Sequence, residues 1–221
     1  MQLILASGSP RRRELLTRAQ LDFSILSVDI DETPYFDETP TDYIERMVAT
    51  KAQGAIEQLN KALSCQLEEC LSDSYMILTA DTIGVLADGK TVLMKPENRE
   101  QAYQMWQQMS DNVHEVWTAV QVTLVALRPK KCDTQTFEII NHQHITERTD
   151  VTFIPLSAEM MRTYWDSGEP ADKAGGYGIQ GLGAAWVSRI NGSYTNVVGL
   201  PLAQTLALIK NITEVSADRK A

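Results

Sequence analysis

The sequence predicts an α/β fold with a mixed β-sheet, and two observations carry this prediction. Short apolar runs alternate with segments of helical periodicity along most of the 221 residues. In addition, the segment 114–127 alternates like a long strand, and the segment 134–153 looks like its antiparallel partner. Alternating strands and helices favour a sheet that is covered by helices, and the long hairpin adds antiparallel pairing to it.

The first half of the chain supplies clear local signals. The apolar run near the N-terminus is only about five residues long and follows no basic segment, so we interpret it as a strand and not as a signal peptide. Pro10 suits the first turn of a helix, and Ser9 is a natural N-cap. Asp88-Gly89 is a good hairpin turn. The predicted elements are strand 2–6, helix 10–19, a strand near 22–27, an acidic loop 29–33, a helix from 39 to the middle sixties with an extension over 60–73, and strands 75–79, 83–86 and 91–94.

The second half begins with a helix that Pro96 is expected to start and that runs to about residue 109. The long strand pair follows. A glycine-rich segment then separates the next helix from a strand, and Asn191-Gly192 is read as a turn. The basic segment after Glu214 is expected to be mobile. The predicted elements are strands 114–127 and 134–153, helix 157–167, the glycine-rich loop 168–183, strand 184–190 and helix 201–209.

Charge and composition restrict the possible partners. The formal net charge is −9, and this excludes broad, non-specific nucleic-acid binding, whose affinity comes from Lys and Arg on phosphates. A local basic pocket in an acidic protein suits a small polyanion instead. No stretch approaches the ~18 apolar residues of a membrane span. Cys65, Cys70 and Cys132 are odd in number and fit no zinc pattern, so we expect reduced thiols in a cytoplasmic protein.

The passage from the first strand into the first helix has the composition of a phosphate site. Ser7, Gly8 and Ser9 precede the helix, and Arg11 to Arg13 occupy its first turn. Basic residues at a helix N-terminus are disfavoured by the helix dipole unless an anion binds there. Free backbone N–H groups, hydroxyls and guanidinium groups together form a cradle for phosphate. A solvated basic turn is the alternative interpretation.

A second phosphate-binding pattern is expected to be coincidental. Residues 84–91, Gly-Val-Leu-Ala-Asp-Gly-Lys-Thr, satisfy the nucleotide-binding P-loop pattern. In a P-loop the lysine and threonine open a helix, so that the backbone wraps the phosphates. Here a β-type run follows at 91–94, and Asp88-Gly89 explains the spacing as a hairpin. We therefore favour the hairpin.

Two charged residues follow apolar runs. Asp81 is expected at the C-terminal edge of a buried strand, where a carboxylate can bind a divalent metal or activate water; a strand-end cap is the alternative. Lys95 precedes Pro96, and an edge-strand lysine that discourages pairing is its alternative. His142 and His144 share one face of a strand, but no third metal ligand is evident, so a solvated face is favoured. His114 is interpreted as structural.

The glycine-rich segment 172–183 contains five glycines in nine residues, which permit close approach of the backbone and positive φ angles. A flexible linker is the alternative interpretation. Lys173, Tyr177, Ile179 and Gln180 are too specific for a simple linker. The Gln180 amide offers both a donor and an acceptor to the edge of a planar base.

Five motifs occur in order along the chain: ASGSPRR at 6–12, ADT at 80–82, KP at 95–96, DKAGGYGIQG at 172–181 and GSYTNVVGLP at 192–201. Any one of them is modest, whereas the ordered set is specific. Taken together, they resemble the motifs of the Maf family of nucleoside triphosphate pyrophosphatases. The Tyr-Gly-Ile-Gln version of the fourth motif resembles the branch that acts on dTTP and UTP.

The resemblance implies an elongated two-lobed α/β fold with a central cleft, often a homodimer, with one domain over 1–210 and a mobile tail over 211–221. It implies cleavage between the α- and β-phosphates of dTTP or UTP, and Asp81 as proton acceptor. Glu32 and Asp81 would support a divalent metal, Mg²⁺ or Mn²⁺. Arg11, Thr82 and Gln180 match specificity positions. The residues implied around the triphosphate are Ser7, Arg11, Arg12, Lys51 and Lys95.

Three departures and two alternatives accompany this resemblance. The segments 60–73 and 129–145 look longer than in compact members, and Ser110-Asp111 stands where a Ser-Gly turn is usual. One alternative is a P-loop kinase or NTPase, which would transfer or release a single phosphate. The other is a non-catalytic, nucleotide-binding regulator of septum formation. No stable nucleic-acid or membrane partner is expected.

Overall fold

The computed structural model describes residues 1–64, 72–129 and 135–218, and these residues fold around one mixed sheet. The strand order is β2-β1-β3-β5-β6-β7, with β4 paired to β3. β1 runs parallel to β2 and to β3, and the other pairs are antiparallel. The predicted mixed-sheet α/β class is confirmed. The strands are β1 (Gln2–Leu5), β2 (Ser24–Ile25), β3 (Ser74–Val85), β4 (Val92–Leu93), β5 (Val113–Pro129), β6 (Gln135–Phe153) and β7 (Val187–Asn191).

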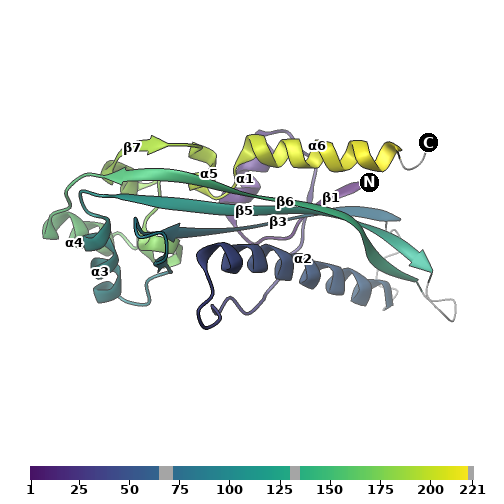
Figure 1. The fold of residues 1–221 in the computed structure, drawn as a ribbon, viewed down its shortest axis with the longest axis horizontal. Helices are drawn as coiled ribbons and strands as arrows, with labels where there is room; N and C mark the ends of the chain where they lie inside the picture. The colour runs from purple at the N-terminus through teal and green to yellow at the C-terminus, as the bar shows by residue number, and fades with distance from the viewer. Residues whose placement is uncertain (65–71, 130–134, 219–221) are drawn as a thin grey trace.

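Helices cover both faces of this elongated sheet (Figure 1). α2 lies along one face, α1 and α6 lie along the other, and α3 and α4 lie at the end of the sheet near β7. The helices are α1 (Pro10–Arg18), α2 (Pro40–Ser64), α3 (Arg99–Met109), α4 (Ala158–Asp166), α5 (Tyr194–Val198) and α6 (Leu202–Asp218), with 3-10 turns η1 (Glu169–Asp172), η2 (Ala174–Gly176) and η3 (Leu182–Trp186).

Apolar spacing explains how α2 attaches to the sheet. Its buried residues recur three and four positions apart, so that they form one stripe along the helix. Ile44, Met47 and Val48 pack against Ile83 and the neighbouring strands, and none of these four side chains is more than 4% exposed. The same stripe contains Lys51, which is buried among apolar residues although it is charged. α2 therefore holds one cation at a fixed place over the sheet.

β3 is one continuous strand, so the prediction of two strands with Asp81 at a strand end is wrong. It pairs with β5 along its whole length. On its other edge, β3 pairs with β1 only up to Leu78 and with β4 only at Gly84 and Val85. Among the described strands, none pairs with residues 79–83 on that edge. The neighbouring strand β1 ends shortly before it reaches Asp81, whereas β3 continues to Val85. The sequence of β3 alone does not show whether β3 or its neighbour ends near Asp81.

The start of α3 also differs from the prediction. Pro96 does not begin the helix; the Asn98 side chain accepts a hydrogen bond from the Gln101 N–H at 2.9 Å, and α3 begins at Arg99. An asparagine N-cap is favoured over its neighbours because it satisfies a free N–H. After α3, Asp111 adopts a φ of +52°. This left-handed conformation favours glycine, and aspartate tolerates it better than most residues, which accounts for Asp111 in a turn where glycine is usual.

The C-terminal region contains three further corrections. Residues 184–186, expected in a strand, belong to η3, and β7 begins at Val187. α5 was not predicted. The last helix continues past the expected end at residue 209 to Asp218, and Ile212 within it is fully buried. The proposed division into a domain over 1–210 and a tail over 211–221 stays a prediction. In the described part of the chain, no helix combines the length and apolar character needed to cross a membrane.

Candidate active site

A cavity of about 670 Å³ opens beside the unpaired edge of β3. It lies between the start of α1, the middle of α2, the segment after β4 and the glycine-rich segment that follows α4. All nine residues that the sequence analysis places at the site line this one cavity, although they come from six separate parts of the chain. They are Ser7, Arg11, Arg12, Glu32, Lys51, Asp81, Thr82, Lys95 and Gln180.

The start of α1 brings hydroxyl groups and the first-turn N–H groups to the cavity. Ser9 is the N-cap, and its side chain accepts from the Arg12 N–H at 3.5 Å. Ser7 Oγ accepts from the Ser9 N–H at 3.2 Å and lies in the same cavity. No acidic residue occupies the first turn. The positive end of the helix dipole therefore faces the cavity without a carboxylate of its own turn to neutralise it.

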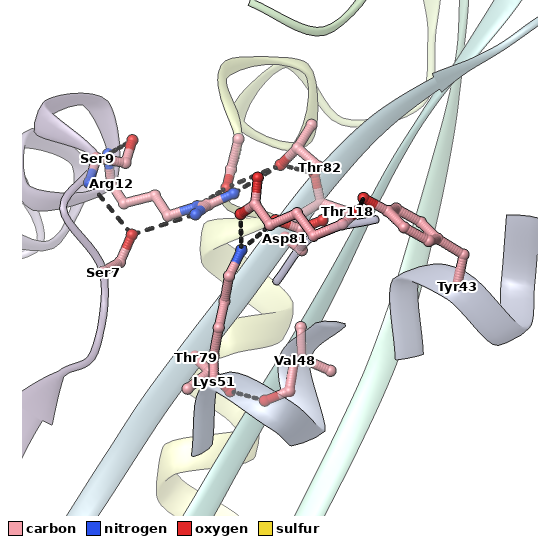
Figure 2. Close-up of polar contacts among 12 residues, drawn as sticks. Ser7, Ser9, Arg12, Tyr43, Val48, Lys51, Thr79, Asp81, Thr82 and Thr118 are labelled. Atoms are coloured by element: carbon pink, nitrogen blue, oxygen red, sulfur yellow. Dashed lines mark hydrogen bonds and ion pairs between the residues drawn. The ribbon is translucent and has the colours of Figure 1, made fainter. Parts of the chain in front are cut away.

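The Arg12 guanidinium holds several elements together (Figure 2). Its Nη1 donates to Ser7 Oγ at 3.2 Å and its Nη2 donates to Thr82 Oγ1 at 3.0 Å. Its Nε donates to the carbonyl oxygen of Gly199 at 2.8 Å. Burial lowers the pKa of Arg12, and the nearby carboxylate of Asp81 acts in the opposite direction. Three of the five guanidinium N–H groups are engaged in these bonds, so at most two can serve a ligand.

A chain of buried hydroxyls continues behind Arg12. Thr82 Oγ1 lies 3.0 Å from Thr118 Oγ1, and Thr118 in turn donates to the carbonyl oxygen of Asn196 at 3.0 Å. The Asn196 side chain donates to the carbonyl oxygen of Val116 at 2.9 Å. Thr118 and Asn196 are fully buried. These bonds fix the end of α5 against β5 and thereby hold the Gly199 carbonyl that orients Arg12.

Asp81 and Thr82 are neighbours in β3, and their side chains point to opposite faces of the sheet. Thr82 meets Arg12 from α1, whereas Asp81 meets Lys51 from α2 (Figure 2). Both nevertheless line the same cavity, because the edge of β3 is unpaired at this point. The end of β1 therefore allows one strand to supply a hydroxyl and a carboxylate to one site.

Cations and carboxylates alternate on the α2 side of the cavity. Lys51 Nζ lies 2.6 Å from Asp81 Oδ1 and 3.0 Å from Glu32 Oε1. Lys95 Nζ lies 3.5 Å from the other oxygen of Glu32. Burial raises the pKa of Glu32, but the two lysines outweigh burial, so this pKa is lowered overall. The backbone carbonyl of Glu32 accepts from the Tyr43 hydroxyl at 2.9 Å, which ties its loop to α2.

The donor atoms at this place fit a small divalent cation. Glu32 and Asp81 direct carboxylate oxygens toward a single point, which the Lys51 ammonium contacts. Mg²⁺ is commonly held by one or two carboxylates together with substrate phosphates and water. No group of three or more His, Cys, Asp or Glu side chains able to hold a metal occurs in the described residues. The two carboxylates therefore fit a metal that phosphate oxygens help to bind.

The glycine-rich segment forms the opposite wall of the cavity. Gly175, Gly178, Gln180 and Gly181 line it, together with Tyr177. Tyr177 is buried, and its hydroxyl lies 2.8 Å from Nε2 of His114. His114 and Tyr177 also meet edge to face, with ring centroids 5.4 Å apart. The glycine-rich segment therefore packs on a buried pair of aromatic rings. The alternative interpretation of this segment as a flexible linker is wrong.

The remaining motifs are resolved as structural. Residues 84–91 span the end of β3 and the turn into β4, where Gly84 pairs with Leu93 and Gly89 has a φ of +68°. No helix follows this turn, so the P-loop alternative is contradicted.

His142 and His144 are exposed on β6, as expected for a solvated face. Cys65, Cys70 and Cys132 lie outside the described residues.

Three parts of the site were not predicted from the sequence. Thr118 carries no distinctive signal, because threonine is common in strands. The contribution of Gly199 is a backbone carbonyl, which any residue type would supply. Glu169 lines the cavity beside the glycine-rich segment, and its only sequence signal is its position shortly before that segment.

Comparisons with known proteins identify the family of this chain. The family described as Maf-like protein matches residues 2–212. The chain is 68% identical to a dTTP/UTP pyrophosphatase of Psychrobacter cryohalolentis, with 97% of this chain and 98% of that protein covered. It is 67% identical to a dTTP/UTP pyrophosphatase of Psychrobacter arcticus (98% and 97% covered) and 42% identical to one of Aliivibrio fischeri (94% and 96% covered). The chain therefore belongs to the Maf family.

Proposed function

We propose that this protein is a nucleoside triphosphate pyrophosphatase that hydrolyses dTTP and UTP to the monophosphate and pyrophosphate. One observation carries the proposal: a single cavity joins an unneutralised helix start, several cationic side chains, two carboxylates and an amide-bearing glycine-rich wall. The helix start and the cationic side chains can bind a triphosphate. The two carboxylates can support phosphoryl chemistry, and the amide of the glycine-rich wall can bind a base. The relatives reported above are dTTP/UTP pyrophosphatases, which supports the same substrates.

The triphosphate binds at the end of the cavity formed by α1 in this proposal. Ser7 and the first-turn N–H groups offer donors, and Arg11, Arg12, Lys51 and Lys95 supply positive charge around them. Guanidinium groups make charge-assisted, often bidentate hydrogen bonds with phosphate oxygens. The bonds from Arg12 to Ser7, Thr82 and Gly199 hold its guanidinium in place before the substrate arrives. Little reorganisation is then needed when charge develops on the phosphates.

Glu32 and Asp81 would hold the divalent cation, Mg²⁺ or Mn²⁺. When bound, the cation neutralises charge on the phosphates. Lys51 contacts both carboxylates in the structure, so the ammonium has to shift toward the phosphates when the cation binds. The phosphates themselves provide the negative charge that Lys51 then meets.

Asp81 is the residue that we propose as the proton acceptor. Its side chain is only 15% exposed and lies at the cavity surface of β3. A carboxylate in this place orients a water molecule toward the α-phosphorus and accepts its proton as the oxygen–phosphorus bond forms. The bond between the α-phosphorus and the bridging oxygen breaks, and pyrophosphate leaves with that oxygen. Hydrolysis at this bond gives one monophosphate and one pyrophosphate.

Base recognition falls to Gln180, Thr82 and Arg11 in this account. Thymine and uracil present carbonyl oxygens and one ring N–H at one edge. A glutamine amide complements that edge with one donor and one acceptor. Gln180 is exposed on the cavity wall, so its amide is accessible to an incoming base. A homodimer and a role in removing unwanted or modified pyrimidine nucleotides complete the proposal and rest on the family resemblance. A cytoplasmic location rests on the pattern of the three cysteines.

A substrate panel tests this function. The purified protein is incubated with each common NTP and dNTP, with and without Mg²⁺ or Mn²⁺, and the products are separated by ion exchange. Metal-dependent pyrophosphate release with dTTP and UTP as the best substrates is expected. Nucleotide binding without turnover would support the regulator alternative, and orthophosphate as the first product would contradict the proposed reaction.

A further inference from the structure

The Glu169 carboxylate lies inside the glycine-rich segment and is surrounded by hydrogen-bond donors. Its Oε1 accepts from the Tyr164 hydroxyl at 2.7 Å and from the Gly183 N–H at 3.3 Å. Its Oε2 accepts from the Leu182 N–H at 2.8 Å. Glu169 belongs to η1, and Tyr164 belongs to α4, so the carboxylate joins the segment to the helical layer.

Tyr164 extends this arrangement to the other side of Gln180. Its hydroxyl accepts from the Gly178 N–H at 3.0 Å while it donates to Glu169. The segment is therefore anchored at Gly178, two residues before Gln180, and at Leu182, two residues after it. Both anchors lead to the same carboxylate. The backbone of Gln180 therefore lies between two anchored residues, Gly178 and Leu182.

The glycines of this segment fit closely around the carboxylate. A Cβ atom on Gly181 would come within 2.5 Å of both the Oε1 and the Cδ of Glu169, far closer than non-bonded atoms approach. A Cβ atom on Gly183 would lie 2.8 Å from the carbonyl oxygen of Gly178. Gly181 is required because a Cβ atom there would meet the Glu169 carboxylate, and Gly183 is required because a Cβ atom there would meet the backbone of Gly178. The close fit makes the position of Gln180 depend on Glu169.

The groups around Glu169 favour its ionised form. Burial raises the pKa of Glu169, but the bonds from Tyr164, Leu182 and Gly183, together with the charge of Lys173, outweigh burial, and the pKa is lowered overall. Lys173 Nζ also donates to the Glu169 carbonyl oxygen at 2.5 Å. An ionised carboxylate accepts hydrogen bonds at both oxygens without donating. A glutamine in its place would direct its side-chain N–H groups at the backbone N–H of Leu182 or of Gly183, which are also donors.

We propose that Glu169 is a positioning residue for base selection, which fixes the loop that carries Gln180 without itself contacting the base. This inference rests on the proposed function, because it assigns base recognition to Gln180. It separates two tasks of the cavity: Arg12, Lys51 and Lys95 serve the phosphates, and Glu169 together with Tyr164 fixes the loop that carries Gln180.

The test compares Glu169→Gln with Glu159→Gln, a matched change at an exposed acid in the first turn of α4. Two quantities are measured in the full-length protein: kcat/KM for each common NTP and dNTP, and hydrogen–deuterium exchange of the Leu182 and Gly183 amides. In Glu169→Gln, we expect the preference for dTTP and UTP over other triphosphates to fall ~10-fold or more, the scale of losing a hydrogen bond to a charged group. Amide exchange should accelerate by a similar factor. Glu159→Gln should match the wild type in both.

The possible outcomes are distinguishable. A wild-type protein that releases no pyrophosphate would overturn the proposed function. If the wild type releases pyrophosphate but Glu169→Gln keeps its substrate ranking, or loses activity equally on all substrates, the inference about Glu169 is wrong. Should Glu169→Gln fail to fold, Tyr164→Phe removes only the hydroxyl that links Gly178 with Glu169, and the same two measurements then decide.

Discussion

Lys51 places its ammonium 2.6 Å from Asp81 Oδ1 while it also lies 3.0 Å from Glu32 Oε1. The two carboxylates come from a loop and from β3, and their oxygens meet at one cation. Like charges repel at this range unless a positive charge lies between them. The pair therefore marks the place where a positive charge is required. The same argument explains why a divalent cation fits there, with Lys51 released toward the phosphates.

Asp81→Asn tests the proposed proton acceptor. The amide keeps the size and polarity of the side chain but loses its negative charge and its proton-accepting ability. Turnover of dTTP should fall by ~100-fold or more, the usual scale for a positioned acid–base group. Initial rates at saturating dTTP and metal measure this. A folded variant with near-normal turnover would leave Asp81 as a structural partner of Lys51.

Lys95→Ala and Lys90→Ala form a matched pair on either side of β4. Lys95 Nζ lies in the cavity near Glu32, so its loss should reduce kcat/KM for dTTP by ~10-fold or more, as expected for a charge-assisted contact. The Lys90 N–H donates to Asp88 within the exposed turn, and this backbone bond survives truncation of the side chain. Lys90→Ala should therefore stay within a few-fold of the wild type. The reverse ranking would contradict the hairpin interpretation of residues 84–91.

Gln180→Ala tests direct base recognition. A cavity built to hydrogen-bond a base discriminates against others because mismatched polar groups stay unpaired, at ~1–3 kcal/mol each. The substitution should narrow the gap between dTTP or UTP and the other triphosphates more than it slows chemistry on the best substrate. Measurement of kcat/KM across the common NTPs and dNTPs decides this. An unchanged ranking in a folded variant would assign base recognition to other residues.

His114 should make stability depend on pH. Burial lowers its pKa to about 4, whereas an unfolded histidine has a pKa of about 6.5. The unfolded state therefore binds a proton first as the pH falls. The contribution of neutral His114 to the free energy of unfolding is complete above pH ~6.5, decreases by roughly 3 kcal/mol down to pH ~4 and is constant below.

Urea unfolding of the wild type, His114→Gln and His142→Gln between pH 7.5 and 4.5 measures this effect. Carboxylates weaken all three proteins in acid, so the difference between them isolates the histidine. The gap between wild type and His114→Gln should shrink as the pH falls. His142 is exposed, so His142→Gln should follow the wild-type profile. Parallel profiles for all three proteins would show that His114 is not held neutral by burial.

Local signals in the sequence predict the local structure well. Ser9 and Pro10 fix the start of α1, and Asp88-Gly89 fixes the hairpin, because capping and turn chemistry act within a few residues. The error at Pro96 has the same local origin: Asn98 offers a better cap two residues later. Such competition between neighbouring signals shifts a boundary without changing the order of the elements.

Contacts between distant residues are harder to predict. The accessibility of Asp81 depends on where β1 ends, some 75 residues earlier, and no pattern within β3 records that. The Arg12 guanidinium bonds to Gly199 across 187 positions through a backbone carbonyl, which has no side-chain signature. Glu169 acts through backbone N–H groups for the same reason. The ordered motifs nevertheless contain seven of the nine site residues that line the cavity, and the family resemblance added Glu32 and Lys51, which lie outside the motifs.

The central claim is that this cavity cleaves the bond between the α- and β-phosphates, and ³¹P NMR of the products tests it most directly. The wild-type protein is mixed with dTTP and Mg²⁺ or Mn²⁺, with Asp81→Asn as the comparison, and spectra are taken before the substrate is exhausted. We expect dTMP and pyrophosphate to grow in equal amounts, with no dTDP, and much more slowly in Asp81→Asn. Early appearance of dTDP and orthophosphate would contradict the account.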